Sequence, residues 1–222
     1  GRSVEDAAIG LGVIAGRDRY DSTSADVEVD DYAAAASETL KGVVIGRPRE
    51  YFPDSLDQRI RARCDAALDA LRELGATVRD VSLPHTDLAI PTYYIIAPAE
   101  ASSNLARFDG VRYGARAKAA ALREMYADTR SHGFGREVTR RILLGTYVLS
   151  AGYYDAYYRK AQEVRALIAN DFQKVFTSGV DVLFTPTAPT PAFPIGAKSD
   201  PYEMYLSDIF TATANLAGIP AL

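Results

Sequence analysis

The chain has 222 residues, of which 48% are apolar, and its 29 acidic residues outnumber its 25 basic ones, so the formal net charge is −4. This composition is typical of a globular protein, and the single cysteine, Cys64, excludes a disulfide framework or a cysteine-rich zinc site. A pI near 5.3 argues against a chain that wraps nucleic acid by its own charge. Since there is no signal-peptide pattern and no apolar run of the roughly 20 residues that span a bilayer, we expect a cytoplasmic protein without membrane contact.

The first elements in chain order predict an α/β fold. Apolar residues recur at helical spacing in residues 4–14, and a short buried strand at 43–46 precedes a second amphipathic helix at 57–74. Gly75 ends this helix, and residues 77–81 alternate like a strand. This succession predicts a βαβ-like unit in a parallel or mixed sheet with helices packed over it. Further helices are predicted at 93–105, 115–128, 136–144, 153–176, 203–208 and 209–216, and a further buried strand at 181–185.

The sequence offers little for metal, nucleotide or histidine chemistry. His85 and His132 both lie beside turn-forming residues, which argues against a Ser-His-Asp triad or a histidine metal site. Residues 17–31 are acidic but lack the fixed glycine and terminal glutamate of a calcium loop, so we interpret them as a solvated connection. The glycines form no phosphate-binding loop. We therefore predict no metal site in this chain.

Polar residues interrupt three apolar stretches, at Tyr93, at Arg140 and Arg141, and at Asp208. Each has an ordinary structural interpretation, namely a core tyrosine with its hydroxyl at the surface, a solvated helix face and a helix N-cap. Together they can also bind an amino acid, because Arg pairs with a carboxylate, Asp pairs with an ammonium and Tyr positions an amide or carbonyl. The residues alone leave both interpretations open.

Six long blocks, spread in order along the chain, are distinctive: YYIIA (93–97), EASSNLARFDGVRYG (100–114), GFGREV (133–138), SAGYYDAYY (150–158), PTAPT (186–190) and NLAGIPA (215–221). These blocks closely resemble the A subunits of bacterial glutamyl-tRNA(Gln)/aspartyl-tRNA(Asn) amidotransferases, which are members of the amidase signature family. The resemblance covers essentially the whole chain, and such long blocks are more specific than one short motif.

The resemblance implies a mixed, mostly parallel sheet covered by helices, and a glutaminase activity. In the family, the A subunit hydrolyses glutamine with a Ser nucleophile, a second Ser in a cis peptide and a Lys base. The ammonia travels to the B subunit, where ATP and Mg²⁺ serve to activate the mischarged glutamyl or aspartyl group on tRNA. The resemblance therefore implies the B and C subunits of the amidotransferase as partners, aminoacyl-tRNA bound mainly through the B subunit, and no cofactor in this chain itself.

One departure from the family pattern concerns catalysis. In the family both catalytic serines and the lysine lie upstream of the position of Gly1, and Ser102 and Ser103 lack the flanking glycines of the catalytic motif. We therefore expect residues 1–222 to be the central to C-terminal portion of a single amidase domain, with no catalytic residue. This portion alone should not hydrolyse amides.

What the chain keeps, by similarity, is part of the glutamine pocket. The resemblance implies that Arg141 pairs with the α-carboxylate, that Asp208 pairs with the α-ammonium, and that Tyr93 helps to place the side-chain amide. If the match to the family is shifted by one residue, Arg140 takes the place of Arg141 as the partner of the α-carboxylate. Two other functions stay open, namely a stand-alone amidase of the same superfamily that acts on small amides, and a non-catalytic module that binds glutamine or a partner without releasing ammonia.

Overall fold

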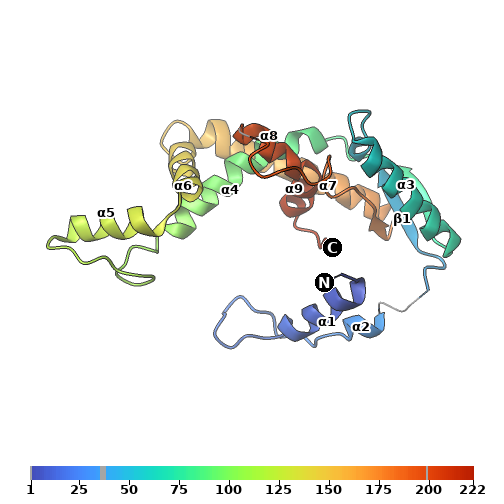
Figure 1. The fold of residues 1–222 in the computed structure, drawn as a ribbon, viewed down its shortest axis with the longest axis horizontal. Helices are drawn as coiled ribbons and strands as arrows, with labels where there is room; N and C mark the ends of the chain where they lie inside the picture. The colour runs from blue at the N-terminus through green and yellow to red at the C-terminus, as the bar shows by residue number, and fades with distance from the viewer. Residues whose placement is uncertain (1, 36–38, 199) are drawn as a thin grey trace.

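The computed structural model describes residues 2–35, 39–198 and 200–222, and Figure 1 shows the arrangement of their elements. A three-stranded parallel sheet has the strand order β2-β1-β3. Its strands are β1 (Val44–Pro48), β2 (Thr77–Val81) and β3 (Val182–Leu183). The helix α3 (Gln58–Glu73) connects β1 to β2, which confirms the predicted βαβ unit.

The prediction of a buried strand over residues 181–185 is wrong in both length and burial. Only Val182 and Leu183 are in the strand, and Val182 is 49% exposed. The Asp181 carboxylate accepts a hydrogen bond from the Val44 backbone at 2.8 Å. Pro186 then follows closely, and because proline has no N–H to donate to a ladder, the pairing ends early.

Local sequence explains the bounds of α3. The Asp57 carboxylate accepts a hydrogen bond from the backbone N–H of Arg59 at 2.8 Å and so caps the first turn. Cys64 and Leu68 lie on the buried face. Just beyond the helix, Gly75 has φ +100°, a conformation that glycine adopts without steric cost and that turns the chain into β2.

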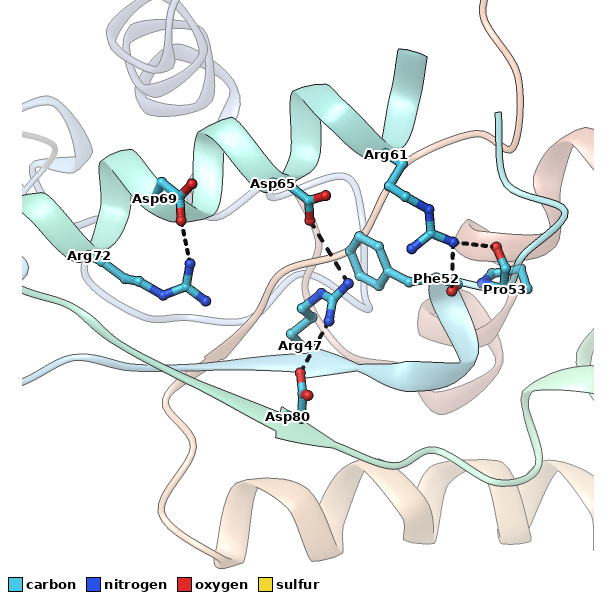
Figure 2. A network of polar contacts seen from close by, with 8 residues as sticks. All are labelled: Arg47, Phe52, Pro53, Arg61, Asp65, Asp69, Arg72 and Asp80. Carbon is cyan, nitrogen blue, oxygen red and sulfur yellow. Dashed lines mark hydrogen bonds and ion pairs between the residues drawn. The ribbon is translucent and has the colours of Figure 1, made fainter. Parts of the chain in front are cut away.

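A polar cluster joins α3 to the sheet, as Figure 2 shows. Arg47 of β1 lies between the carboxylates of Asp65 of α3, at 3.9 Å, and Asp80 of β2, at 3.4 Å. Its guanidinium carbon is 4.2 Å from the centroid of the Phe52 ring. We call Arg47, Asp65, Asp80 and Phe52 the Arg47 network. Its ion pairs connect β1 to both α3 and β2.

Helices form most of the remaining regular structure, and the largest core cluster draws most of its residues from α4, α7 and α9. The helix α4 packs against α6, α7 and α9. The helices are α1 (Val4–Ile14), α2 (Tyr32–Ala35), α4 (Ala89–Leu105), α5 (Leu122–Gly133), α6 (Arg136–Val148), α7 (Lys160–Thr177), α8 (Pro201–Tyr205) and α9 (Ile209–Ala217), with 3-10 turns at Arg49–Tyr51, Thr86–Leu88 and Leu206–Asp208 and a π-helix at Tyr154–Arg159.

Several predicted helix bounds need correction. The helix α1 has its predicted bounds, but α4 begins at Ala89, because Pro91 lies in its first turn, where the missing N–H has no helical partner to lose. The helix predicted from residue 115 begins at Leu122, since Arg116 turns back to donate a hydrogen bond to the carbonyl of Val111 at 3.1 Å. The predicted helix over residues 153–176 is a π-helix followed by α7.

A close crossing of α4 and α6 fixes their relative position. Gly145 of α6 is buried, and a Cβ atom at this position would overlap the backbone carbonyl of Pro98 in α4. Only glycine permits this approach. The crossing sets α6 so that Arg141, one turn before Gly145, lies beside Tyr93 of α4.

Within the described residues, we find no helix that combines the length and the apolar character needed to cross a membrane.

Candidate functional site

A cavity of about 420 Å³ lies between α4, α6 and the segment that leads into α9. It is lined by Tyr94, Glu137, Arg140, Arg141, Lys198, Asp200, Met204, Tyr205 and Asp208. Two of the predicted site residues, Arg141 and Asp208, therefore line one cavity. The third, Tyr93, is not in the lining, but its hydroxyl accepts a hydrogen bond from Nη1 of Arg141 at 3.4 Å. The structure thus brings together the three residues to which the family resemblance gave a role in the pocket.

The carboxylate of Glu137 is shared between the two arginines. Its Oε1 accepts a hydrogen bond from Nε of Arg141 at 2.9 Å, and its Oε2 pairs with Nη2 of Arg140 at 2.6 Å. The three residues are neighbours on one face of α6, because they are spaced by three and four positions. The hydrogen bond from Arg141 lowers the pKa of Glu137, and the same bond raises the pKa of Arg141. We call Glu137, Arg140 and Arg141 the Glu137 network.

The two arginines differ in their surroundings. The Arg141 side chain is 32% exposed, and besides its contact with Tyr93 its guanidinium carbon lies 5.9 Å from the centroid of the Tyr94 ring. The Arg140 side chain is 46% exposed and lies 5.5 Å from the centroid of the Tyr205 ring. Arg141 is therefore the arginine that reaches α4, whereas Arg140 lies nearer to the solvated helix face.

Two stacked tyrosines form one wall of the cavity. The rings of Tyr94 in α4 and Tyr205 in α8 have centroids 3.9 Å apart and an interplanar angle of 29°. Burial raises the pKa of Tyr94 to about 12, and the neighbouring Arg141 opposes this shift. The Tyr94 phenol is therefore protonated at neutral pH. The sequence pointed to Tyr93, but it is Tyr94 that lines the cavity.

Asp208 lines the cavity and does not cap its helix. It occupies the N-cap position of α9, yet its side chain makes no capping hydrogen bond there. The interpretation of Asp208 as a capping residue is therefore wrong. Near it, Nζ of Lys198 donates a hydrogen bond to Oγ of Ser207 at 2.8 Å.

The charges that line the cavity balance. Arg140, Arg141 and Lys198 supply positive charge, and the carboxylates of Glu137, Asp200 and Asp208 supply negative charge. A cavity with separated charges of both signs suits a small zwitterion, which carries an ammonium and a carboxylate of its own. Among the residues that the structure describes, no group of three or more His, Cys, Asp and Glu side chains lies close enough to hold a metal ion.

Some of these lining residues were missed at the sequence level. The spacing of Glu137 to Arg140 and Arg141 is a usable signal, because residues three and four apart meet on a helix. Tyr94 lies in an apolar stretch of the sequence, so nothing in the pattern indicated that it would line a cavity. Lys198 follows the proline-rich segment, and Tyr205 lies within the helix predicted over residues 203–208, but no pattern in the sequence places either side chain at the cavity.

The sequence model of the amidase family matches residues 1–222. The chain is 56% identical over its whole length to a protein named as the A subunit of glutamyl-tRNA(Gln) amidotransferase from Methylorubrum populi, and 59% identical to the one from Carboxydothermus hydrogenoformans. It spans 45% and 46% of the length of these two relatives, which is less than half.

Solved structures show the same fold. The crystal structure of the glutamyl-tRNA(Gln) amidotransferase A subunit from Thermotoga maritima matches with a TM-score of 0.72 and 39% identity, covering 98% of this chain and 42% of that one. A peptide amidase from Stenotrophomonas maltophilia matches with a TM-score of 0.64 and 24% identity, covering 98% of this chain and 44% of that one. The second likeness concerns the fold alone.

Proposed function

The chain belongs to the amidase family, and we propose that it is part of the glutamine-hydrolysing subunit of a tRNA-dependent amidotransferase. The observation that carries this proposal is the cavity in which Arg141 and Asp208 lie together, in a chain that is 56% identical to a protein of that name. The peptide amidase is only 24% identical, so the comparison favours the amidotransferase over a stand-alone amidase.

Glutamine at neutral pH carries an α-carboxylate, an α-ammonium and a neutral amide. In our proposal the Arg141 guanidinium pairs with the carboxylate and Asp208 pairs with the ammonium. These two contacts fix one end of the molecule, so that the amide at the other end takes a defined direction. Tyr93 acts on the amide in this scheme, and the protonated Tyr94 hydroxyl offers a further hydrogen bond from the cavity wall.

The division of labour follows from the residues. In our proposal the Ser nucleophile, the second Ser and the Lys base that the family resemblance implies lie outside residues 1–222, in the rest of the whole protein. This chain then supplies substrate orientation, and the other part supplies covalent chemistry. The ammonia passes to a B subunit, where ATP and Mg²⁺ activate the aminoacyl-tRNA, with a C subunit completing a cytoplasmic complex.

The test is glutamine hydrolysis by the whole protein, assembled with its partner subunits. Arg141→Ala removes the charged partner of the α-carboxylate and should raise the KM for glutamine by about thirtyfold, or ~2 kcal/mol. Ammonia release at varied glutamine concentration measures this. An unchanged KM would remove Arg141 from the pocket.

Arg140→Ala is the matched control, because it removes the neighbouring arginine from the same helix. We expect it to change the KM less than Arg141→Ala does, and the opposite order would assign the carboxylate to Arg140. A whole protein that releases ammonia but amidates no tRNA with its partners would be a stand-alone amidase. A whole protein that binds glutamine and releases no ammonia would be a non-catalytic module.

A further inference from the structure

The Glu137 network contains a carboxylate for which the proposed glutamine pocket has no direct use. Glutamine brings a carboxylate of its own, so an acid beside Arg141 competes for the same guanidinium. The position of Glu137 on that guanidinium decides whether it competes or assists.

The contacts show which donors of Arg141 are engaged. A guanidinium has five N–H donors in a planar fork. Glu137 takes the one on Nε, at 2.9 Å, and the Tyr93 hydroxyl takes one on Nη1, at 3.4 Å. Neither contact uses Nη2, and Nη1 keeps a second hydrogen, so the terminal nitrogens still have three hydrogens with which to pair with a carboxylate. Glu137 therefore leaves the binding end of Arg141 open.

The other oxygen of Glu137 engages Arg140. With Nη2 of Arg140 at 2.6 Å from Oε2, the second guanidinium is drawn to the opposite side of the same carboxylate. Each oxygen of Glu137 thus serves a different arginine, and the two side chains are held apart although they are adjacent in sequence.

A further contact shows that Glu137 does more than stabilise its own helix. The Tyr205 hydroxyl donates a hydrogen bond to Oε1 of Glu137 at 3.4 Å, and Tyr205 belongs to α8, far away in the sequence. The Tyr205 ring in turn stacks on Tyr94. Glu137 therefore connects α6 to the opposite wall of the cavity.

We propose that Glu137 is a positioning residue, which holds Arg141 by its Nε so that the end of the fork faces the substrate carboxylate, and which keeps Arg140 away from it. This inference rests on the proposed function, because it assumes that Arg141 binds the α-carboxylate of glutamine. It adds a role for Glu137 in specificity, since Glu137 determines which of the two neighbouring arginines binds the α-carboxylate.

The experiment uses the whole protein with its partner subunits and compares glutamine with 4-aminobutanamide, which is glutamine without the α-carboxylate. For Glu137→Gln we expect the KM for glutamine to rise about tenfold with kcat changed by less than about twofold, because the fork loses its fixed direction. The inhibition constant of 4-aminobutanamide should be unchanged, because this compound makes no contact through the fork of Arg141. In the Arg141→Ala background, Glu137→Gln should have no further effect on the KM.

The control is Glu124→Gln, which removes the same charge from an exposed position on α5 and should leave both constants unchanged. If Glu137→Gln leaves the KM for glutamine unchanged, or weakens glutamine and 4-aminobutanamide equally, the positioning role is wrong while the proposed function stands. If the unaltered protein releases no ammonia from glutamine, the proposed function itself fails. Thermal unfolding of each variant separates these outcomes from a loss of folding.

Discussion

The Arg47 network and the Glu137 network use the same chemistry with the charges reversed. In the first, one guanidinium lies between two carboxylates, those of Asp65 and Asp80 (Figure 2). In the second, one carboxylate lies between two guanidinium groups. The first joins two strands and a helix, whereas the ion pairs of the second lie within α6.

The difference separates a polar cluster that holds the fold from one that is ready for a ligand. Both terminal nitrogens of Arg47 already face a carboxylate, and its side chain is 24% exposed. Arg140 and Arg141 share one acid, so their network has an excess of donors, and it lines a cavity. An excess of donors beside a cavity is therefore the feature that indicates binding, rather than the presence of arginines.

The largest effect should come from Gly145→Ala, which acts on the helix that carries the Glu137 network. The new methyl group would overlap the Pro98 carbonyl, so α6 must move away from α4, and we expect a loss of about 3 kcal/mol of unfolding free energy. Denaturant unfolding of the whole protein measures this. The KM for glutamine should rise as well, because Arg141 lies one turn away.

Gly133→Ala is its control, because a methyl group at this last residue of α5 meets no atom within 4 Å. We expect this variant to be as stable as the unaltered protein or slightly more stable. Equal destabilisation by the two variants would show that the α4 and α6 crossing is less tight than the structure indicates.

A smaller effect is expected for Arg47→Ala, which removes the centre of the Arg47 network. The loss of both ion pairs, the Phe52 contact and the packing of the aliphatic stem should cost about 1 to 2 kcal/mol of unfolding free energy. Arg47→Met retains the aliphatic stem, so the difference between Arg47→Met and Arg47→Ala measures how much of this loss comes from the packing of the stem rather than from the charge. Neither variant should alter the KM for glutamine, and a change in KM would mean that the two networks are coupled.

The smallest effect is expected for Arg72→Ala, which removes an exposed ion pair of α3 (Figure 2). Arg72 and Asp69 are 2.6 Å apart, but their side chains are 48% and 70% exposed. Such pairs contribute below about 0.5 kcal/mol, so the melting temperature should hardly change. A loss comparable to that of Arg47→Ala would contradict the ranking of the two sites by burial.

The sequence predicted the elements whose pattern is local. α1 and β2 have their predicted bounds, and α3 lies within one residue of its prediction, because a capping acid, an apolar face and a stop glycine are all near in sequence. The start of α5 was missed, because a side chain that folds back on its own loop leaves no periodic signal. The length of β3 depends on its partner strand and on the prolines that follow it.

The candidate site was predicted in part. Arg141, Asp208 and Tyr93 could be named because of the family resemblance, and the structure brings them together. Their companion Glu137 was not singled out, although its spacing to Arg141 is helical. Tyr205 could not be found from pattern alone, because its stacking on Tyr94 depends on how α8 folds over α4.

Pro98, which meets Gly145 at the helix crossing, also affects how α4 can bend. Proline has no N–H, so it offers no helical hydrogen bond to the carbonyl oxygen of Tyr94, four residues earlier. The joint between the two halves of α4 therefore falls at the turn that carries the cavity tyrosine. Small motions of this helix should concentrate there, so the cavity wall can adjust to a ligand while the buried start of α4, at Ala89 and Ile90, stays in place.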